Sequence, residues 1–321
     1  MIANLQILRA FAALNVVVFH IISAAETHDY KTEFVSVLEG WGANGVDIFF
    51  VISGFVMLYT QMKTKRTVLG FLKLRVIRIA PIYWILTSVV ILLYVLDPSA
   101  FREMKITSDW ALSSYLFLSG ALQFDYPIMN VGWTLEWEML FYLVFALSLW
   151  FSTWRSSLAA VFIVLTAVAL VLSNYILLEF LGGLVVALVY GKGFVRGSTG
   201  VISLGIGIFL LCLSILPSVR ELIDSRVLLW GFPSLLIVMG ALAVKQQKNK
   251  LGELLGDASY SIYLIQVLTI PVFYKVATKL QLVVNTDLLA LICLISTAIG
   301  GVLMYLILEK PLTSFLRTRI S

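Results

Sequence analysis

Long apolar windows separated by short polar stretches run along the whole chain. Each window holds about 17–23 residues, enough for a helix to cross the hydrocarbon core of a bilayer. The windows lie at residues 5–24, 44–62, 76–96, 133–152, 157–173, 175–191, 200–216, 227–244, 258–277 and 286–308. An unpaired peptide group is too costly in lipid, so each window is expected to be helical. The pattern predicts an all-α, polytopic membrane bundle of about ten transmembrane helices.

One further apolar stretch, residues 110–122, is too short for a regular span and is interrupted by Ser113, Ser114, Ser119 and Gly120. Counting it as a span would invert every later loop. Without it, most of the 23 lysines and arginines fall on the side of the N-terminus, and basic residues are enriched on the cytoplasmic side of membrane proteins. We therefore expect a re-entrant segment, or one packed at the outer surface, and cytoplasmic termini.

Composition supports a membrane protein. The chain is 60% hydrophobic and 13% charged, with a mean hydropathy of +0.99, far from soluble globular usage. No polar stretch is long enough for a soluble domain, so one membrane domain is expected over residues 1–321. Cys212 and Cys293 each lie in an apolar run, which predicts no disulfide. The first window also resembles a cleavable signal peptide, but its length and the spans that follow favour a retained helix.

The first window carries two polar groups, Arg9 and His20. They are eleven positions apart, which is about three helical turns, so they share one helix face. A charge at mid-bilayer costs at least about 2.5–3.5 kcal/mol, so this face is expected to meet other helices or a polar cavity. His28 in the following loop is the chain's second histidine. His20 is thus the first candidate for proton chemistry near neutral pH.

The most basic stretch covers residues 63–78 and is expected to be an amphipathic segment at the cytoplasmic interface, leading into the third helix. Arg75 and Arg78 are three positions apart, so both guanidinium groups can reach one phosphate cluster from the same face. That arrangement suits a nucleotide or coenzyme. The alternative is a topology signal that contacts anionic lipid headgroups.

Acidic residues stand near the starts of two predicted helices. Asp47 lies about one turn inside the second helix, where the helix dipole stabilises an anion, so a structural role is the alternative to a catalytic one. Glu136 and Glu138 point about 200° apart, so only one can face a given cavity. Glu138 shares a face with Tyr142, which favours it as the inward acid. An interfacial acid within an aromatic belt is the alternative.

Other features predict less chemistry. Ser53-Gly54 is expected to allow close helix packing. Glu179 and Glu309 lie near span ends and fit an interfacial or packing role as well as a functional one. No zinc-ligand spacing is visible, so no metal site is predicted.

Several motifs together resemble acyltransferase family 3, and in particular its exopolysaccharide and O-antigen acetyltransferase branch. They are Arg9-x10-His20, the run from Gly45 to Phe55, Arg75-x-x-Arg78 with Pro81-x-Tyr83-Trp84, Trp133-Thr-Leu-x-x-Glu138-x-x-Phe-Tyr142, the run from Leu255 to Leu264, and Glu309-Lys-Pro311. The family often has a histidine where this chain has Gln266, whose amide cannot act as a base.

The resemblance implies a ten-helix bundle that takes an acyl group, usually acetyl, from cytoplasmic acyl-CoA. The acceptor would be a hydroxyl of a glycan or lipid-linked sugar at the outer side of a bacterial inner membrane. The implied catalytic residues are His20, Arg9, Glu138 and Asp47, and the implied coenzyme-binding residues are Arg75, Arg78 and Tyr83. Expected partners are the donor, the acceptor and membrane lipid, without nucleic acid. Polysaccharide-assembly proteins or a homodimer are compatible with this function.

In the expected mechanism, neutral His20 accepts the proton of the attacking sugar hydroxyl, a form of help that contributes about 10²–10⁴-fold. A transporter or flippase for a lipid-linked sugar or small anion would instead use the same polar stripe as its pathway. Broken helices or paired half-repeats would favour that alternative, and neither is evident in the sequence. A non-catalytic partner of a polysaccharide synthase is a third possibility.

Overall fold

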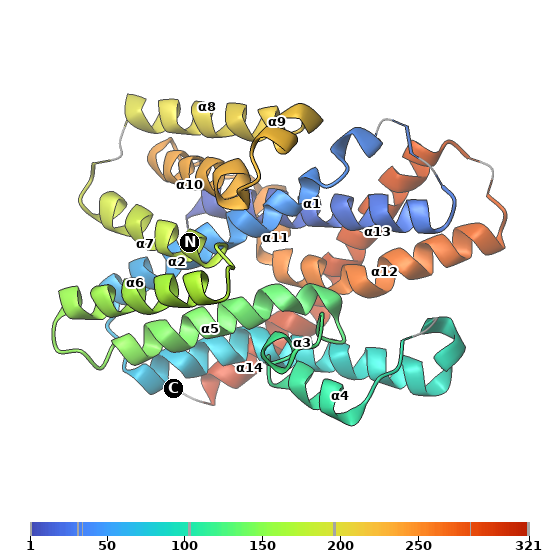
Figure 1. Cartoon of the computed structure of the whole chain (residues 1–321), viewed down its shortest axis with the longest axis horizontal. Coiled ribbons are helices and arrows are strands. Elements are labelled where there is room, and N and C mark those ends of the chain that lie inside the picture. The colour runs from blue at the N-terminus through green and yellow to red at the C-terminus, as the bar shows by residue number, and fades with distance from the viewer. Residues whose placement is uncertain are drawn as a thin grey trace.

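A computed structural model describes the chain at residues 2–30, 32–33, 35–101, 104–194, 197–282 and 284–319. Within these ranges every regular element is a helix, as the hydropathy pattern predicts. The helices pack side by side along the long dimension of the molecule (Figure 1). Six of them are long and apolar enough to cross a membrane.

Each predicted window coincides with a helix. The longer α-helices are α1 (Ala3–Thr27), α2 (Asn44–Lys63), α3 (Val68–Leu96), α5 (Trp133–Ser148), α6 (Trp154–Val171), α7 (Leu177–Gly191), α8 (Ser198–Leu213), α10 (Phe232–Ala243), α12 (Ser259–Lys279) and α13 (Thr286–Met304). Shorter ones are α4 (Ser108–Tyr115), α9 (Pro217–Leu222), α11 (Lys250–Asp257) and α14 (Lys310–Thr318). Single turns are η1 (Val35–Leu38), η2 (Trp41–Ala43), η3 (Pro98–Phe101), η4 (Gly120–Leu122) and η5 (Asn130–Gly132). The π-helical turns η6 (Val227–Gly231) and η7 (Tyr305–Glu309) lead into α10 and α14.

The third helix begins earlier than its hydropathy predicts. It starts at Val68, where the hydroxyl of Thr67 caps the helix by accepting a hydrogen bond from the amide of Gly70 at 3.2 Å. Lysine and arginine lower hydropathy but are good helix formers. Most of the basic stretch is therefore the first part of α3 itself, not a separate interfacial segment. Arg75 and Arg78 consequently lie within the body of a 29-residue helix.

The segment at 110–122 does not cross the membrane as a helix. Its helical part, α4, has eight residues, or about 12 Å of length. It lies along α3 (Figure 1), where Trp84 donates from Nε1 to the carbonyl of Tyr115 at 2.8 Å. Glu136 of α5 accepts from the amides of Ser119 and Gly120 at 2.8 and 2.9 Å. The prediction of a short, non-spanning segment is confirmed.

Small residues let α2 pack closely on its neighbours. A Cβ on Gly54 would collide with the carbonyl oxygen of Phe180 in α7. On α1, the carbonyl of Ala12 leaves no room for a Cβ at Gly45. Such close backbone approach replaces the hydrophobic driving force that is absent between helices in lipid. The packing role predicted for Gly54 is confirmed, and α2 becomes the central helix beside which the site is built.

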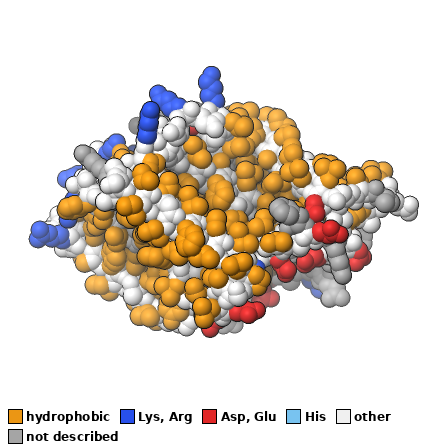
Figure 2. Space-filling model, turned by 90° about the horizontal axis from the view of Figure 1, so that it is seen from above, with side chains coloured by type: hydrophobic (Ala, Val, Ile, Leu, Met, Phe, Trp, Pro, Cys, Tyr) orange, Lys and Arg blue, Asp and Glu red, His pale blue; other side chains and the backbone are white. Residues whose placement is uncertain are grey.

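The outer surface is apolar over most of the face in Figure 2. Lysine and arginine side chains gather at its left and upper margins, and aspartate and glutamate at its lower right. Large hydrophobic side chains are exposed on helices far apart in the sequence, including Ile163 of α6, Phe209 of α8 and Ile295 of α13. A contiguous apolar surface of this kind suits lipid and not water.

Candidate active site

A cavity of about 480 Å³ lies between α1, α2, α3, α5 and α12. Its volume is within the range of small-molecule sites, about 300–1,000 Å³. Along α2 its lining extends from Val46 to Lys63, which is about 25 Å of helix. The hydrocarbon core of a bilayer is about 30 Å thick. The cavity is therefore long enough to bring a ligand from one side of the membrane deep into its interior.

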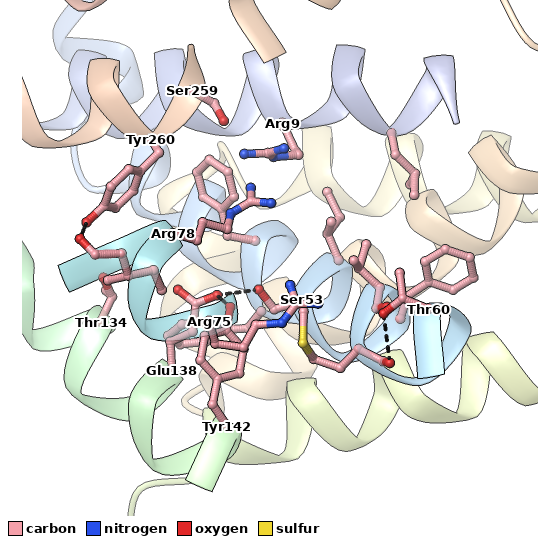
Figure 3. A pocket seen from close by; sticks show the side chains of 18 of the residues that line it. Arg9, Ser53, Thr60, Arg75, Arg78, Thr134, Glu138, Tyr142, Ser259 and Tyr260 are labelled. Atoms are coloured by element: carbon pink, nitrogen blue, oxygen red, sulfur yellow. Dashed lines mark hydrogen bonds between the residues drawn. The ribbon is translucent and has the colours of Figure 1, made fainter. Parts of the chain in front are cut away.

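Three arginines converge on this cavity. Arg9 comes from α1, and Arg75 and Arg78 come from α3. Figure 3 shows the guanidinium groups of Arg9 and Arg78 facing the same space, with Arg75 nearby. Lys63 adds a fourth cation to the lining, and Glu138 is its carboxylate. The cavity is thus strongly cationic.

These arginines have no carboxylate partner within ion-pair distance in the described part of the chain. Arg9 donates to Oε1 of Gln6 at 3.1 Å, and Gln6 in turn donates to Asp257. Arg75 is buried, with its guanidinium 5.3 Å from the ring centre of Phe71. An arginine kept in a buried cavity without a carboxylate in direct contact can bind an anionic ligand.

Two buried polar atoms of the lining also have no hydrogen-bond partner among the described residues. They are Nε of Arg75 and Oγ of Ser259. An unsatisfied buried polar group costs about 1–3 kcal/mol. Such groups are retained where a ligand satisfies them, so both atoms fit a cavity built to be occupied. The donor set of guanidinium and hydroxyl groups fits phosphate and not a metal ion.

Glu138 is the acid that faces the cavity, as its spacing from Tyr142 predicts. It accepts hydrogen bonds from Oγ of Ser53 at 2.7 Å and from the hydroxyl of Tyr142 (Figure 3). Glu136 points away and holds the segment after α4. Ser53 was expected to serve helix packing only. Because consecutive helical residues point about 100° apart, Gly54 meets α7 while Ser53 faces the cavity.

Asp47 lies outside the cavity lining. It is in the first turn of α2, as predicted, and is fully buried. Arg226 grips its carboxylate with two hydrogen bonds, from Nε at 3.1 Å and from an Nη at 2.8 Å. Arg226 also donates to the carbonyl of Ala43 at 3.0 Å. This arrangement matches the structural alternative for Asp47, and its catalytic role stays a prediction.

His20 lies near one end of the cavity and is not part of its lining. Its half-buried ring meets the ring of Phe19 edge-on, with centroids 5.0 Å apart. Phe19 packs where a Cβ of Gly42 would be, and Gly42 lies in η2, about one turn before Val46 of α2. His20 therefore lies about one helical turn beyond the Val46 end of the cavity. Its catalytic role stays a prediction.

The two remaining predicted positions are buried in the core. Tyr83 stacks on Phe117 with ring centroids 4.8 Å apart, so its ring packs α3 against the segment after α4, outside the cavity lining. Gln266, which replaces the histidine common in the resembling family, is buried and donates to the carbonyl of Tyr263 at 2.8 Å. The coenzyme-binding role of Tyr83 stays a prediction, and Gln266 was expected to have no catalytic role.

The profile of a family described as "Acyltransferase domain" matches residues 2–306 of the chain. The chain belongs to this family. It is also 31% identical, over 294 residues, to the "Exopolysaccharide production protein ExoZ" of Rhizobium meliloti (strain 1021). That match covers 84% of this chain and 89% of the relative. No solved structure matches the chain.

Family membership and the apolar helices together make the chain an integral membrane acyltransferase. Family membership favours an acyltransferase over the transporter alternative. The acyltransferase family covers all the helices that line the cavity, from α1 to α12.

Proposed function

We propose that this acyltransferase moves an acyl group, most simply acetyl, from cytoplasmic acyl-CoA to a sugar hydroxyl of an exopolysaccharide or its lipid-linked precursor. The acceptor is placed at the outer side of the inner membrane. The observation that carries the proposal is the cavity in which Arg9, Arg75 and Arg78 converge without carboxylate partners. The exopolysaccharide acceptor is supported by the name of the relative ExoZ.

The donor and the cavity have matching chemistry. Coenzyme A carries several phosphates on a nucleotide, followed by a long and narrow arm that ends in the thiol. Guanidinium groups bind phosphate through paired hydrogen bonds, and three of them lie together here. The whole lining follows α2 for about 25 Å, from Val46 to Lys63, and the part beyond the arginines gives the arm room to extend into the membrane interior.

The direction of entry follows from charge. Lys63, Arg75 and Arg78 lie near the junction of α2 and α3, on the side to which most lysines and arginines of the chain are assigned. Basic loops are cytoplasmic by the positive-inside rule. The separate gathering of basic and acidic side chains on the face in Figure 2 supports this orientation. Acyl-CoA, a cytoplasmic metabolite, would therefore meet the basic end first.

The reaction needs a base for the acceptor. The hydroxyl oxygen attacks the thioester carbonyl, the base takes the hydroxyl proton, and the carbon–sulfur bond breaks. The departing thiolate then receives the proton, so that thioester and alcohol become ester and thiol. The candidate bases are Glu138, which lines the cavity, and His20, which lies about one turn beyond its end. Either would supply about 10²–10⁴-fold.

Proteoliposomes with radiolabelled acetyl-CoA and a lipid-linked exopolysaccharide precursor test the function. We expect loss of the base, in His20→Ala or in Glu138→Gln, to lower transfer by at least about 100-fold, and the two variants together identify which residue it is. His28→Ala is the matched control for the histidine, because His28 lies beyond the end of α1 and stacks on Tyr274. Normal transfer in His20→Ala would remove the histidine as base. No transfer by the wild-type protein to any sugar acceptor would overturn the proposed function.

A second measurement tests the direction. Acetyl-CoA does not cross membranes, so vesicles of opposite orientation present it to one face only. Transfer is expected only when the donor is on the side of the Lys63 end of the cavity. Transfer with the donor confined to the opposite face would contradict the orientation while leaving the reaction intact.

A further inference from the structure

Aromatic side chains gather where α2 ends, at the Lys63 end of the cavity. Phe55 and Tyr59, one turn apart on α2, are stacked with ring centroids 5.2 Å apart and an interplanar angle of 18°. Tyr190 of α7 meets both rings edge-on, at 5.7 and 5.8 Å. Phe55 and Tyr59 line the cavity, and Tyr190 supports them from behind. The rings are therefore held in place on one side and face the cavity on the other.

The ring of Tyr59 is also in contact with a flexible lysine. Nζ of Lys63 lies 4.5 Å from the centre of the Tyr59 ring, and the Lys63 side chain is exposed. A cation–π contact at an exposed site is worth about a two- to fivefold effect on an equilibrium. Stacking of a nucleobase on an aromatic ring is worth about five- to 150-fold. A planar base would thus displace the ammonium group and gain by doing so.

We propose that Tyr59 is the stacking platform for the adenine base of the acyl-CoA donor, and that Lys63 swings from its ring onto the donor's phosphates. This inference rests on the proposed function and deepens it. It fixes how the donor lies: the base at the exposed Lys63 end, the phosphates at Arg75, Arg78 and Arg9, and the acyl arm beyond them, towards the Val46 end of the cavity.

The position of the cluster argues against a belt of interfacial aromatics, the usual reason for tyrosine at the end of a membrane helix. Belt residues face headgroups, whereas Phe55 is fully buried and Tyr59 is half-buried against the cavity. The exposure of Lys63 also places the opening at this end. A base bound here would be the last part of the donor to enter.

The first test needs no variant. The fluorescent analogue of coenzyme A that carries 1,N6-ethenoadenine loses emission when its base stacks on an aromatic ring. We expect its emission to be quenched on binding to the purified wild-type protein, and unlabelled acetyl-CoA to reverse the quenching. Binding of the analogue without quenching would overturn the stacking platform.

The second test separates the base from the rest of the donor. Tyr59→Ala is expected to weaken acetyl-CoA binding by about five- to 150-fold and to leave S-acetyl-4′-phosphopantetheine, which lacks the adenosine, unchanged. Tyr59→Phe keeps the ring and should bind both ligands like the wild type. Tyr190→Leu is the graded comparison: it removes a supporting ring but leaves the cavity lining intact, so it should weaken acetyl-CoA binding less than Tyr59→Ala does.

The outcomes are distinct. Unchanged binding of the phosphopantetheine ligand shows that Tyr59→Ala is folded, and equal loss of both ligands would reduce Tyr59 to a structural residue. Equal losses in Tyr190→Leu and Tyr59→Ala would do the same. If the wild-type protein binds neither acetyl-CoA nor the shorter ligand, the proposed function itself is contradicted, independently of any result with Tyr59 variants.

Discussion

Arginine is used in two different ways at the two ends of this protein. At the start of α2, Arg226 forms a two-pronged ion pair with Asp47, whose side chain is fully buried. In the cavity, Arg9, Arg75 and Arg78 have no carboxylate within ion-pair distance among the described residues. The first arrangement is closed: each charge already has its partner. The second is open, and its charges need an anion from outside.

The presence or absence of a carboxylate partner separates a structural arginine from a ligand-binding one, which the residue type alone cannot do. Removing one member of a buried ion pair leaves the other charge uncompensated, which is strongly destabilising. Removing a cavity arginine breaks no ion pair among the described residues, so it is expected to cost the fold less. Stability and donor affinity should therefore separate cleanly between the two groups of arginines.

The largest expected effect is the loss of stability in Arg226→Ala. It leaves the buried carboxylate of Asp47 without its cation, at a cost of about 3–5 kcal/mol. The measurement is the unfolding free energy in mixed detergent–SDS micelles. Arg220→Ala is the control, because Arg220 donates only to backbone carbonyls, of Glu39 and Ile215, and should cost about 1 kcal/mol. Equal unfolding free energies of the Arg226→Ala and Arg220→Ala variants would contradict a structural role for the Arg226–Asp47 ion pair.

The next effect is on donor binding. Arg75→Ala with Arg78→Ala should weaken acetyl-CoA binding by about 100-fold, or about 2.7 kcal/mol, while the unfolding free energy falls by less than in Arg226→Ala, because no ion pair is broken. Lysine at both positions should recover only part of the affinity, since it lacks the planar fork. Isothermal titration calorimetry in detergent measures the donor affinity, and unfolding in mixed detergent–SDS micelles measures the stability. Normal donor binding by the double alanine variant would contradict the assignment of Arg75 and Arg78 to the donor phosphates.

A carboxylate offers a third case, because Glu136 is satisfied by backbone amides and not by a cation. Glu136→Ala removes two charge-assisted hydrogen bonds and should cost about 2 kcal/mol. The loss should be local: faster amide exchange at residues 108–126, with donor affinity unchanged. Protection that stays at the wild-type level in this segment would mean that Glu136 does not hold it.

Local patterns in the sequence were enough for the helices and for part of the site. Hydropathy marks every long helix, and helical spacing places Arg75 beside Arg78 and Glu138 beside Tyr142. These are properties of one element, so they are readable within a few residues. The early start of α3 was missed because hydropathy penalises the basic residues that a helix readily accommodates.

Features that join distant segments were not predictable in this way. Arg226 and Asp47 are 179 positions apart, and the residues around each do not predict that the two form an ion pair. The cavity is equally hard to predict, because Arg9, Ser259 and Arg75 line it only once five helices have packed together. Ser53 was misjudged because its neighbour Gly54 explains the local pattern. Which of two adjacent residues faces a cavity depends on where α5 and α7 are.

The smallest effect sharpens the comparison within the cavity itself, where Glu138 is the one carboxylate among the cations. Tyr142→Phe and Ser53→Ala each remove one hydrogen bond to Glu138 and should lower kcat by about tenfold, or about 1.4 kcal/mol, with the donor Kd unchanged. Tyr142→Leu also removes the ring whose centre lies 6.0 Å from the Arg75 guanidinium, so it should weaken donor binding as well. A Tyr142→Phe variant with normal kcat would mean that Glu138 balances charge in the cavity and takes no proton, which would leave His20 as the base.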